Sequence, residues 1–259
     1  MLRKILKILL IIPLLYLIIT PVYLASSVNS GRCGKISIDI KDSSDYHFVT
    51  KRQLLNLVYN ATGKILGQPV NELSVSEIEG KINDLRELKV AEVYTTVDGT
   101  MHVYVDQRDP IMRVMPNEGG DFFVDKDGVV IRTRNLYTPR LHVVGGNINI
   151  SSAMLNGVSV LDTSIKNSIL KDIYYLVDYI NDESFWSAQI DQIYVDNNDE
   201  IDLIPRVGNQ LIHLGTTENL EGKLRNLAAF YDKVLPEVGW NKYSLINLEF
   251  KDQIVCKKR

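Results

Sequence analysis

Cysteine and histidine, which ligate most structural zinc and iron–sulfur sites, are scarce in this chain. Its 259 residues include only two cysteines and four histidines. The cysteines, Cys33 and Cys256, form no CxxC or Cys/His cluster, so no metal site is indicated. An oxidising compartment would permit a disulfide, but two isolated cysteines so far apart in sequence are more typical of unpaired residues. The histidines are also isolated, and we expect half-buried structural residues rather than ligands or bases; they are His47, His102, His142 and His213.

The chain also lacks the motifs of common enzyme classes. The segment Asn156-Gly-Val-Ser-Val160 has no second glycine at the spacing of a GxSxG nucleophile elbow. Asp125 and Asp127 precede a glycine, but the twelve-residue calcium loop with its terminal glutamate is missing. Gly145-Gly146 is not followed by the glycine, lysine and helix of a phosphate-binding loop. We therefore predict no catalytic residue, no cofactor and no metal.

One enzymatic alternative stays open, because it leaves no local motif. A glycosidase needs two carboxylates about 5 to 10 Å apart in a cleft, and these can come from any part of the chain. A membrane-anchored hydrolase that uses an unidentified carboxylate pair is therefore the second functional hypothesis.

Basic residues are too few for a nucleic-acid surface. Of 29 lysines and arginines, Arg3, Lys4 and Lys7 lie in the first seven residues, which leaves 26 in the remainder against all 32 acidic residues. A nucleic-acid backbone needs concentrated positive charge. We therefore exclude a nucleic-acid partner.

The N-terminal region contains one long apolar run. Residues 5–25, ILKILLIIPLLYLIITPVYLA, would form a helix of about 30 Å, the thickness of a bilayer core. Bases precede the run and none follows until Arg32, so we predict a cytoplasmic tail at 1–4, a single inner-membrane span and an exported remainder. Cleavage near Ala25 is an alternative that stays open; lipidation at Cys33 and a buried core helix fit less well.

Behind a linker at 26–34, the pattern of the segment 35–109 predicts one small α+β domain. Residues 35–40 alternate as a strand, and Thr50 can cap a helix that ends at Gly63. A second helix starts at Ser74 or Ser76, and two alternating strands joined by Asp98-Gly99 follow. The predicted order is β-α-α-β-β.

The segment 110–259 predicts a larger, mixed and mostly antiparallel β domain with flanking helices. Its signals are a hairpin at 122–131, a strand at 141–146, a helix at 163–181, paired strands within 189–204, a strand at 211–215, a helix at 219–235 and a terminal hairpin. In that hairpin, residues 244–250 alternate in polarity, and 254–256 form a short last strand after a tight turn. The fold class is α+β throughout.

The order of these elements resembles the bacterial cell-division family FtsQ/DivIB. The first domain is similar to the family's POTRA domain, and Arg108 and Pro110 match the stretch by which the family leaves it, although Gln107 stands where a glutamate is usual. The later matches are the F-x-D-x-x-G hairpin at 123–128, the strand LHVVGG at 141–146, the pair Lys223-Leu224, and Asn247-Leu248-Glu249-Phe250 in place of Asp-Leu-Arg-Tyr. Glu249 reverses the usual charge of that motif.

The resemblance implies a non-enzymatic divisome scaffold at the septum. Such a protein recruits FtsB-like and FtsL-like bitopic proteins through its C-terminal strands, and other division proteins through the POTRA domain or the membrane span. On this basis Phe250 anchors the partner, residues 252–255 supply an unpaired edge, and Lys257 meets an acidic segment. The predicted partner-binding residues are Glu249, Phe250, Asp252, Gln253, Ile254, Val255 and Lys257.

Three competing interpretations accompany these predictions. The terminal apolar residues Phe250, Ile254 and Cys256 could instead close the core, and both roles can hold together because strand faces alternate. The charged set Glu87, Lys89 and Glu92 in the first domain is expected to be a solvated face rather than a contact. A docking module of outer-membrane assembly is disfavoured, since no barrel sequence follows.

Overall fold

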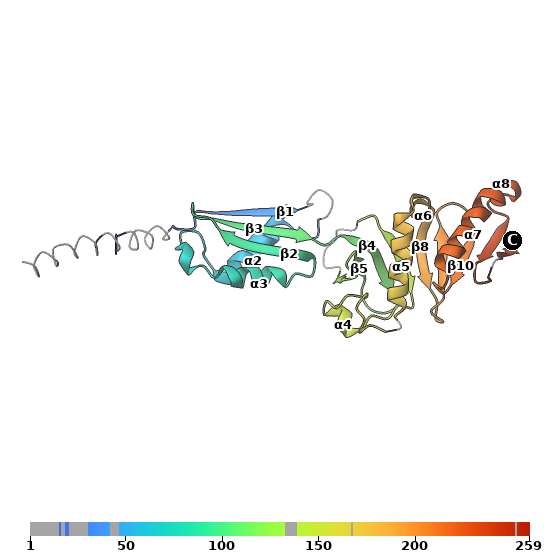
Figure 1. The fold of residues 1–259 in the computed structure, drawn as a ribbon, viewed down its shortest axis with the longest axis horizontal. Helices are drawn as coiled ribbons and strands as arrows, with labels where there is room; N and C mark the ends of the chain where they lie inside the picture. The colour runs from blue at the N-terminus through green and yellow to red at the C-terminus, as the bar shows by residue number, and fades with distance from the viewer. Residues whose placement is uncertain are drawn as a thin grey trace, which may run out of the picture. The chain divides into compact units, whose positions relative to one another are not determined.

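The structure is a computed structural model that describes residues 16, 19–20, 31–41, 47–132, 139–166, 168–251 and 253–259 (Figure 1). The chain divides into two compact units, Met1–Gln107 and Arg108–Arg259. Most of the apolar run at 5–25 lies outside the described residues. In the part that is described, no helix has the length and apolar character that a membrane crossing requires.

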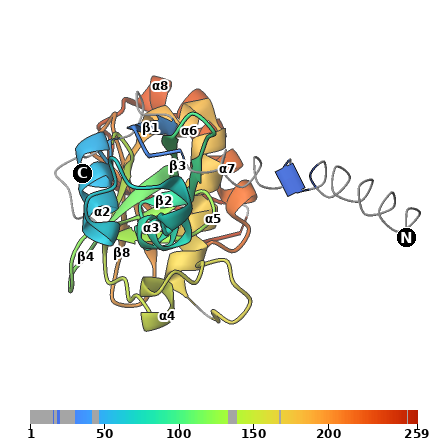
Figure 2. The ribbon, with the colours of Figure 1, turned by 90° about the vertical axis from the view of Figure 1, so that its left-hand side faces the viewer.

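The first unit is a three-stranded sheet with helices on one face. Its elements are β1 (Lys35–Lys41), α2 (Lys51–Thr62), the short 3₁₀ helix η1 (Val70–Glu72), α3 (Val75–Asn83), β2 (Leu88–Thr95) and β3 (Thr100–Gln107). The strand order is β1-β3-β2, with β1 parallel and β2 antiparallel to β3. Helices α2 and α3 lie next to each other in both views (Figures 1 and 2). The predicted β-α-α-β-β order is confirmed.

Local sequence signals explain the elements of this unit. Thr50 and Gln53 form a reciprocal capping box at the start of α2, and Gly63 ends the helix with a positive φ of 73°. Asp98 accepts bonds from the side chains of Thr96 and Thr100, which lower the pKa of its carboxyl and shape the β2–β3 hairpin.

One charged group in this unit departs from expectation. Lys89 and Glu92 are exposed, but Glu87 is buried in the turn before β2, where the Leu88 N–H donates to the Leu85 carbonyl. The prediction that all three form a solvated face is therefore wrong for Glu87.

The second unit is built on a nine-stranded sheet. Its elements are β4 (Pro110–Pro116), β5 (Phe122–Asp125), β6 (Val130–Arg132), β7 (His142–Gly146), α4 (Ser152–Leu155), α5 (Ile169–Asp182), α6 (Ser184–Gln189), β8 (Ile190–Val195), β9 (Ile201–Pro205), β10 (Leu211–Gly215), α7 (Leu220–Lys233), α8 (Leu235–Val238), β11 (Tyr243–Asn247) and β12 (Val255–Lys258). The strand order is β12-β11-β10-β9-β8-β7-β4-β5-β6. The pairs β11–β10, β8–β7 and β7–β4 are parallel and the others antiparallel, which confirms a mixed, mostly antiparallel sheet.

The core of this unit lies between the sheet and helices α5 and α7, which run along one face (Figure 1). Alternate strand residues such as Val144, Ile193 and Ile212 are fully buried against the helices. Their neighbours point to the opposite face, where Met115, Tyr194 and Leu211 remain exposed. One face of the sheet is therefore packed against the helices, and the other is open at these positions, although Phe123 and Ile131 at its β5–β6 end are buried.

Two predicted boundaries in this unit are wrong. The helix expected from residue 163 begins only at Ile169, because Ser164 is held in a turn by the carboxylate of Asp162. The strand expected over 244–250 ends at Asn247, as described below.

The two cysteines are free. Cys33 is fully buried, and Cys256 is half-buried on β12, where burial raises the pKa of its thiol.

Candidate partner-binding site

The last strand of the chain, β12, is an edge of the nine-stranded sheet. It pairs antiparallel with β11, and in the described part of the chain no strand pairs with its other side. An edge strand presents unpaired N–H and C=O groups that can template an added strand. The backbone of β12 is therefore suited to β-augmentation.

The side chains of β12 point alternately to the two faces of the sheet. Cys256 is opposite Ile246 and packs against the core. Val255, which is 46% exposed, is opposite Asn247 and belongs to the open face. The register continues this row across the sheet through Met115, Gly145, Tyr194, Asp202, His213, Asn247 and Val255.

Positive charge lies within β12 and not only after it. We expected a strand at 254–256 with charge beyond its end, and this is wrong. The strand runs from Val255 to Lys258, because a register shift in β11 lets Tyr243 pair with Lys258 and Leu245 with Lys257. Edge lysines discourage indiscriminate pairing with other strands, so an added strand has to carry acidic side chains to match them.

The connection between β11 and β12 is a long loop and not the tight turn that was predicted. The Leu248 N–H donates to the His213 carbonyl at 2.9 Å, and the Asn247 side-chain oxygen accepts the Glu249 N–H at 2.7 Å. These two bonds turn the chain away from β11 after Asn247. Leu248 is consequently buried, whereas Phe250, expected on the same strand face, is 46% exposed.

A groove of about 720 Å³ lies beside this loop. Its walls come from the loop itself, from the end of β10 and from the start of α7. Of the predicted partner-binding residues, four line it: Glu249, Phe250, Gln253 and Ile254. Three groove residues that sequence reasoning did not select are Glu200, Glu218 and Lys223. The carboxylates of Glu200, Glu218 and Glu249 favour a basic or hydroxyl-bearing side chain as occupant.

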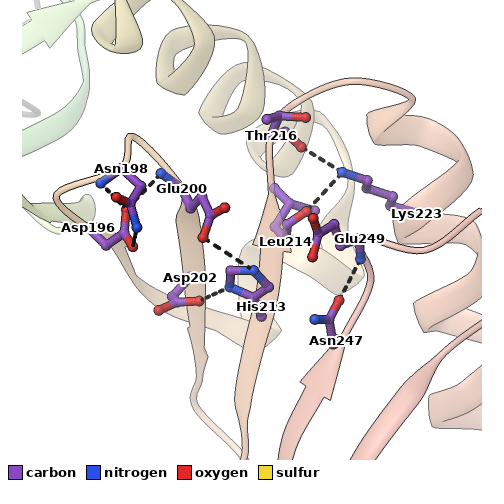
Figure 3. Close-up of polar contacts among 10 residues, drawn as sticks. All are labelled: Asp196, Asn198, Glu200, Asp202, His213, Leu214, Thr216, Lys223, Asn247 and Glu249. Atoms are coloured by element: carbon purple, nitrogen blue, oxygen red, sulfur yellow. Dashed lines mark hydrogen bonds and ion pairs between the residues drawn. The ribbon is translucent and has the colours of Figure 1, made fainter.

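Lys223 holds the wall of the groove together (Figure 3). Its ammonium donates to the carbonyls of Leu214 at 2.9 Å and Thr216 at 2.8 Å, at the end of β10. Partial burial lowers the pKa of Lys223, although Glu218 and Glu249 favour its charged form. Lys223, the first residue of the Lys-Leu pair that supports the family resemblance, therefore stabilises the end of β10.

His213, on the open face, contacts two acidic side chains from β9 and the β8–β9 turn (Figure 3). Its Nδ1 lies 2.8 Å from Asp202 Oδ1, and its Nε2 lies 3.7 Å from Glu200 Oε2. His213 is thus isolated in the sequence but not in the structure, and the prediction of a half-buried strand residue is confirmed for it. Among the described residues, no hydroxyl or thiol forms a hydrogen bond with the imidazole. His213 and its two carboxylates therefore lack the nucleophile of a catalytic triad.

Arg108 and Asp125, which belong to two of the matching motifs, meet in a buried ion pair. The Arg108 guanidinium donates to Asp125 at 2.7 Å, and the same carboxylate accepts the N–H groups of Asp127 and Val129. Burial raises the pKa of Asp125 more than Arg108 and the Val129 N–H lower it. The acidic hairpin turn is therefore structural, and Arg108 ties the start of this unit to it.

The structure separates the predicted partner-binding residues into two groups. Val255 and Lys257 lie on the edge strand, while Glu249, Phe250, Gln253 and Ile254 lie in the preceding loop. Residues 252–255 therefore do not form the edge as a unit, because the strand begins only at Val255; Asp252 lies outside the described residues. Ile254 and Cys256 pack against the core, as the competing interpretation expected, but Phe250 does not close it.

Within the described ranges no group of three or more His, Cys, Asp or Glu side chains could hold a metal ion. The features that a partner can use are the open side of the terminal strand, its basic residues and the adjacent groove. They suit main-chain pairing combined with side-chain recognition.

These features define a class: a two-domain α+β protein in which a small β-α-α-β-β domain precedes a large mixed sheet with an open terminal strand. Residues 109–257 match the family described as FtsQ/DivIB, C-terminal related, and residues 31–106 match the POTRA-like domain. The chain belongs to the FtsQ/DivIB family, which confirms the resemblance seen in the sequence. A comparison with curated proteins finds no match. Membership indicates a role in cell division, and the family is generally membrane-anchored and non-enzymatic.

Proposed function

We propose that this protein is a non-enzymatic divisome scaffold that recruits FtsB-like and FtsL-like bitopic proteins through its C-terminal strands. In this role it sits in the inner membrane at the division septum, with its N-terminus in the cytoplasm and both units in the periplasm. It links early division proteins to septal peptidoglycan synthesis. The POTRA-like unit or the N-terminal segment contacts further division proteins.

The observation that carries the proposal is the open outer side of β12 at the end of a nine-stranded sheet. An extended partner segment that pairs with β12 satisfies these backbone groups and adds a tenth strand. Sheet continuity then provides affinity without a deep pocket.

The side chains around the strand indicate the character of the partner. Lys257 and Lys258 on the strand, with Arg259 behind them, favour an acidic segment. Exposed Phe250 and Val255 offer apolar contact area at the opposite end of the strand. The partner is therefore an amphipathic strand whose acidic residues lie beside the basic end of β12.

Charge reversal on the edge tests the proposal. The double variant Lys257→Glu/Lys258→Glu should weaken binding of the periplasmic segment of the FtsB-like partner by about tenfold or more, since close opposite charges become like charges. Val255→Pro, which distorts the strand and removes one N–H, should also weaken it. Lys64→Glu reverses an exposed lysine in the other unit and is the matched control.

Isothermal titration calorimetry with the purified full chain measures these affinities, and circular dichroism verifies folding. Deletion of residues 257–259 is preferable to truncation before Lys251, because Ile254 and Cys256 pack against the core. If folded charge-reversed and Val255→Pro variants bind like the parent protein, the edge is not the binding site. Release of sugar from cell-wall material by the full chain would instead favour the hydrolase hypothesis.

A further inference from the structure

The two edges of the sheet in the first unit differ in how their backbone groups are satisfied. On β2, the Asn83 side chain bonds both the N–H and the C=O of Ala91, and the Glu79 carboxylate accepts the Val93 N–H at 3.0 Å. Side chains of α3 thus occupy the place of a neighbouring strand. This edge is closed to further pairing.

The other edge, β1, has no such cover among the described residues. From Lys35 to Ile40 its bonds run to β3, apart from a weak contact of the Cys33 thiol with the Lys35 carbonyl. Helix α3 packs closely on β2 and its side chains reach the edge of that strand, whereas α2 packs less extensively on β1. Ile36 and Ile38, on the helix-facing side of β1, consequently stay half-exposed, whereas Ile40 is buried.

Three charged residues lie on the face of β1 opposite the helices, and among the described residues only one of them is in an ion pair. Lys41 is paired with Asp106 at 3.0 Å across the sheet. Lys35 and Asp39 are exposed, and the side chain of neither makes an ion pair or hydrogen bond within the described part of the chain. The edge therefore combines an open backbone, two half-buried isoleucines and two unmatched charges of opposite sign.

We propose that β1 pairs antiparallel with β1 of a second copy of this chain, with the two-fold axis at Ser37. This register puts Lys35 opposite Asp39 of the other copy, and Ile36 opposite Ile38. Both pairs occur twice by symmetry, so the strand is complementary to itself. The two three-stranded sheets become one continuous sheet with all helices on the same side.

The charges select this register over its neighbours. In a symmetric antiparallel pair, opposite residues point to the same face of the sheet, so their numbers are both odd or both even. The two-fold axis therefore passes through one residue, and the alternative registers are centred on the residues next to Ser37. Centring on Ile38 sets Lys35 against Lys41, and centring on Asp39 sets that aspartate against itself. Only the Ser37 register pairs opposite charges over five residues, 35–39.

Cysteine crosslinking in the full chain tests the contact. In a Cys256→Ser background, which leaves only the buried Cys33, Ser37→Cys places two thiols at the axis. Glu92→Cys is the matched control, because Glu92 lies on the same face of the sheet but on the sealed strand β2. Oxidation or a short bismaleimide should give a covalent dimer with Ser37→Cys and background levels with Glu92→Cys.

A charge swap tests the register. Adding Asp39→Lys to Ser37→Cys creates like-charge pairs and should reduce the dimer fraction by about tenfold. Adding Lys35→Glu as well should restore it. Dimer no greater than that of Glu92→Cys overturns the contact, and dimer insensitive to Asp39→Lys overturns the charge-paired register. The result is independent of β12, which lies in the other unit.

Discussion

Loss of the Asp125 carboxylate should destabilise the second unit strongly. Asp125→Ala removes the partner of Arg108 and the acceptor of the buried Val129 N–H. Leaving a buried donor without an acceptor costs about 1–3 kcal/mol. Removing one member of a buried ion pair costs about 3–5 kcal/mol, but Arg108 keeps a contact with Asp127 at 3.8 Å, which lowers this cost. The two effects overlap, and we expect a total of about 3–4 kcal/mol.

Two further variants separate the contributions. Asp125→Asn keeps an oxygen for the Val129 N–H and removes only the charge, so it should cost less than Asp125→Ala. Asp127→Ala changes a residue of the same turn whose side chain is 47% exposed, and should cost about 1 kcal/mol or less.

Urea unfolding followed by tryptophan fluorescence measures these differences. Both tryptophans of the chain, Trp186 and Trp240, lie in the second unit, so the signal reports on that unit alone. Equal destabilisation by Asp125→Ala and Asp127→Ala would refute the assignment of Asp125 as the structural centre of the hairpin.

Two other predictions concern the second unit. Burial, assisted by Arg206, lowers the pKa of His142 below its ordinary 6.5, so the unfolded chain binds this proton more readily. Stability should therefore fall as the pH drops below about 6.5, and His142→Asn should flatten that slope in urea titrations at several pH values; an unchanged slope would exclude His142. Lys223→Met removes two charge-assisted bonds to carbonyls at the C-terminal end of β10 and should cost about 1–3 kcal/mol, measured by the same fluorescence assay. Lys233→Met, on the exposed side of the same helix, should cost little.

Much of the fold follows from local sequence. The capping box at Thr50, the Asp98-Gly99 hairpin and the alternation of strands such as β3 depend on residues close together in the chain. The family resemblance rests on the order of these signals, and it correctly indicated a POTRA-like domain and a large mixed sheet.

The tertiary structure decided what local patterns leave open. Periodicity shows that a segment is a strand but not which strand lies beside it, so the pairing of β4 between β5 and β7 could not be predicted. The end of β11 was misjudged because the His213 carbonyl captures the Leu248 N–H, a contact between residues far apart in sequence. The same holds for the bulge that brings Lys257 and Lys258 into β12. Composition and spacing determined the domains and their elements, whereas long-range hydrogen bonding determined which edges remain open, since those bonds form only when the sheet assembles.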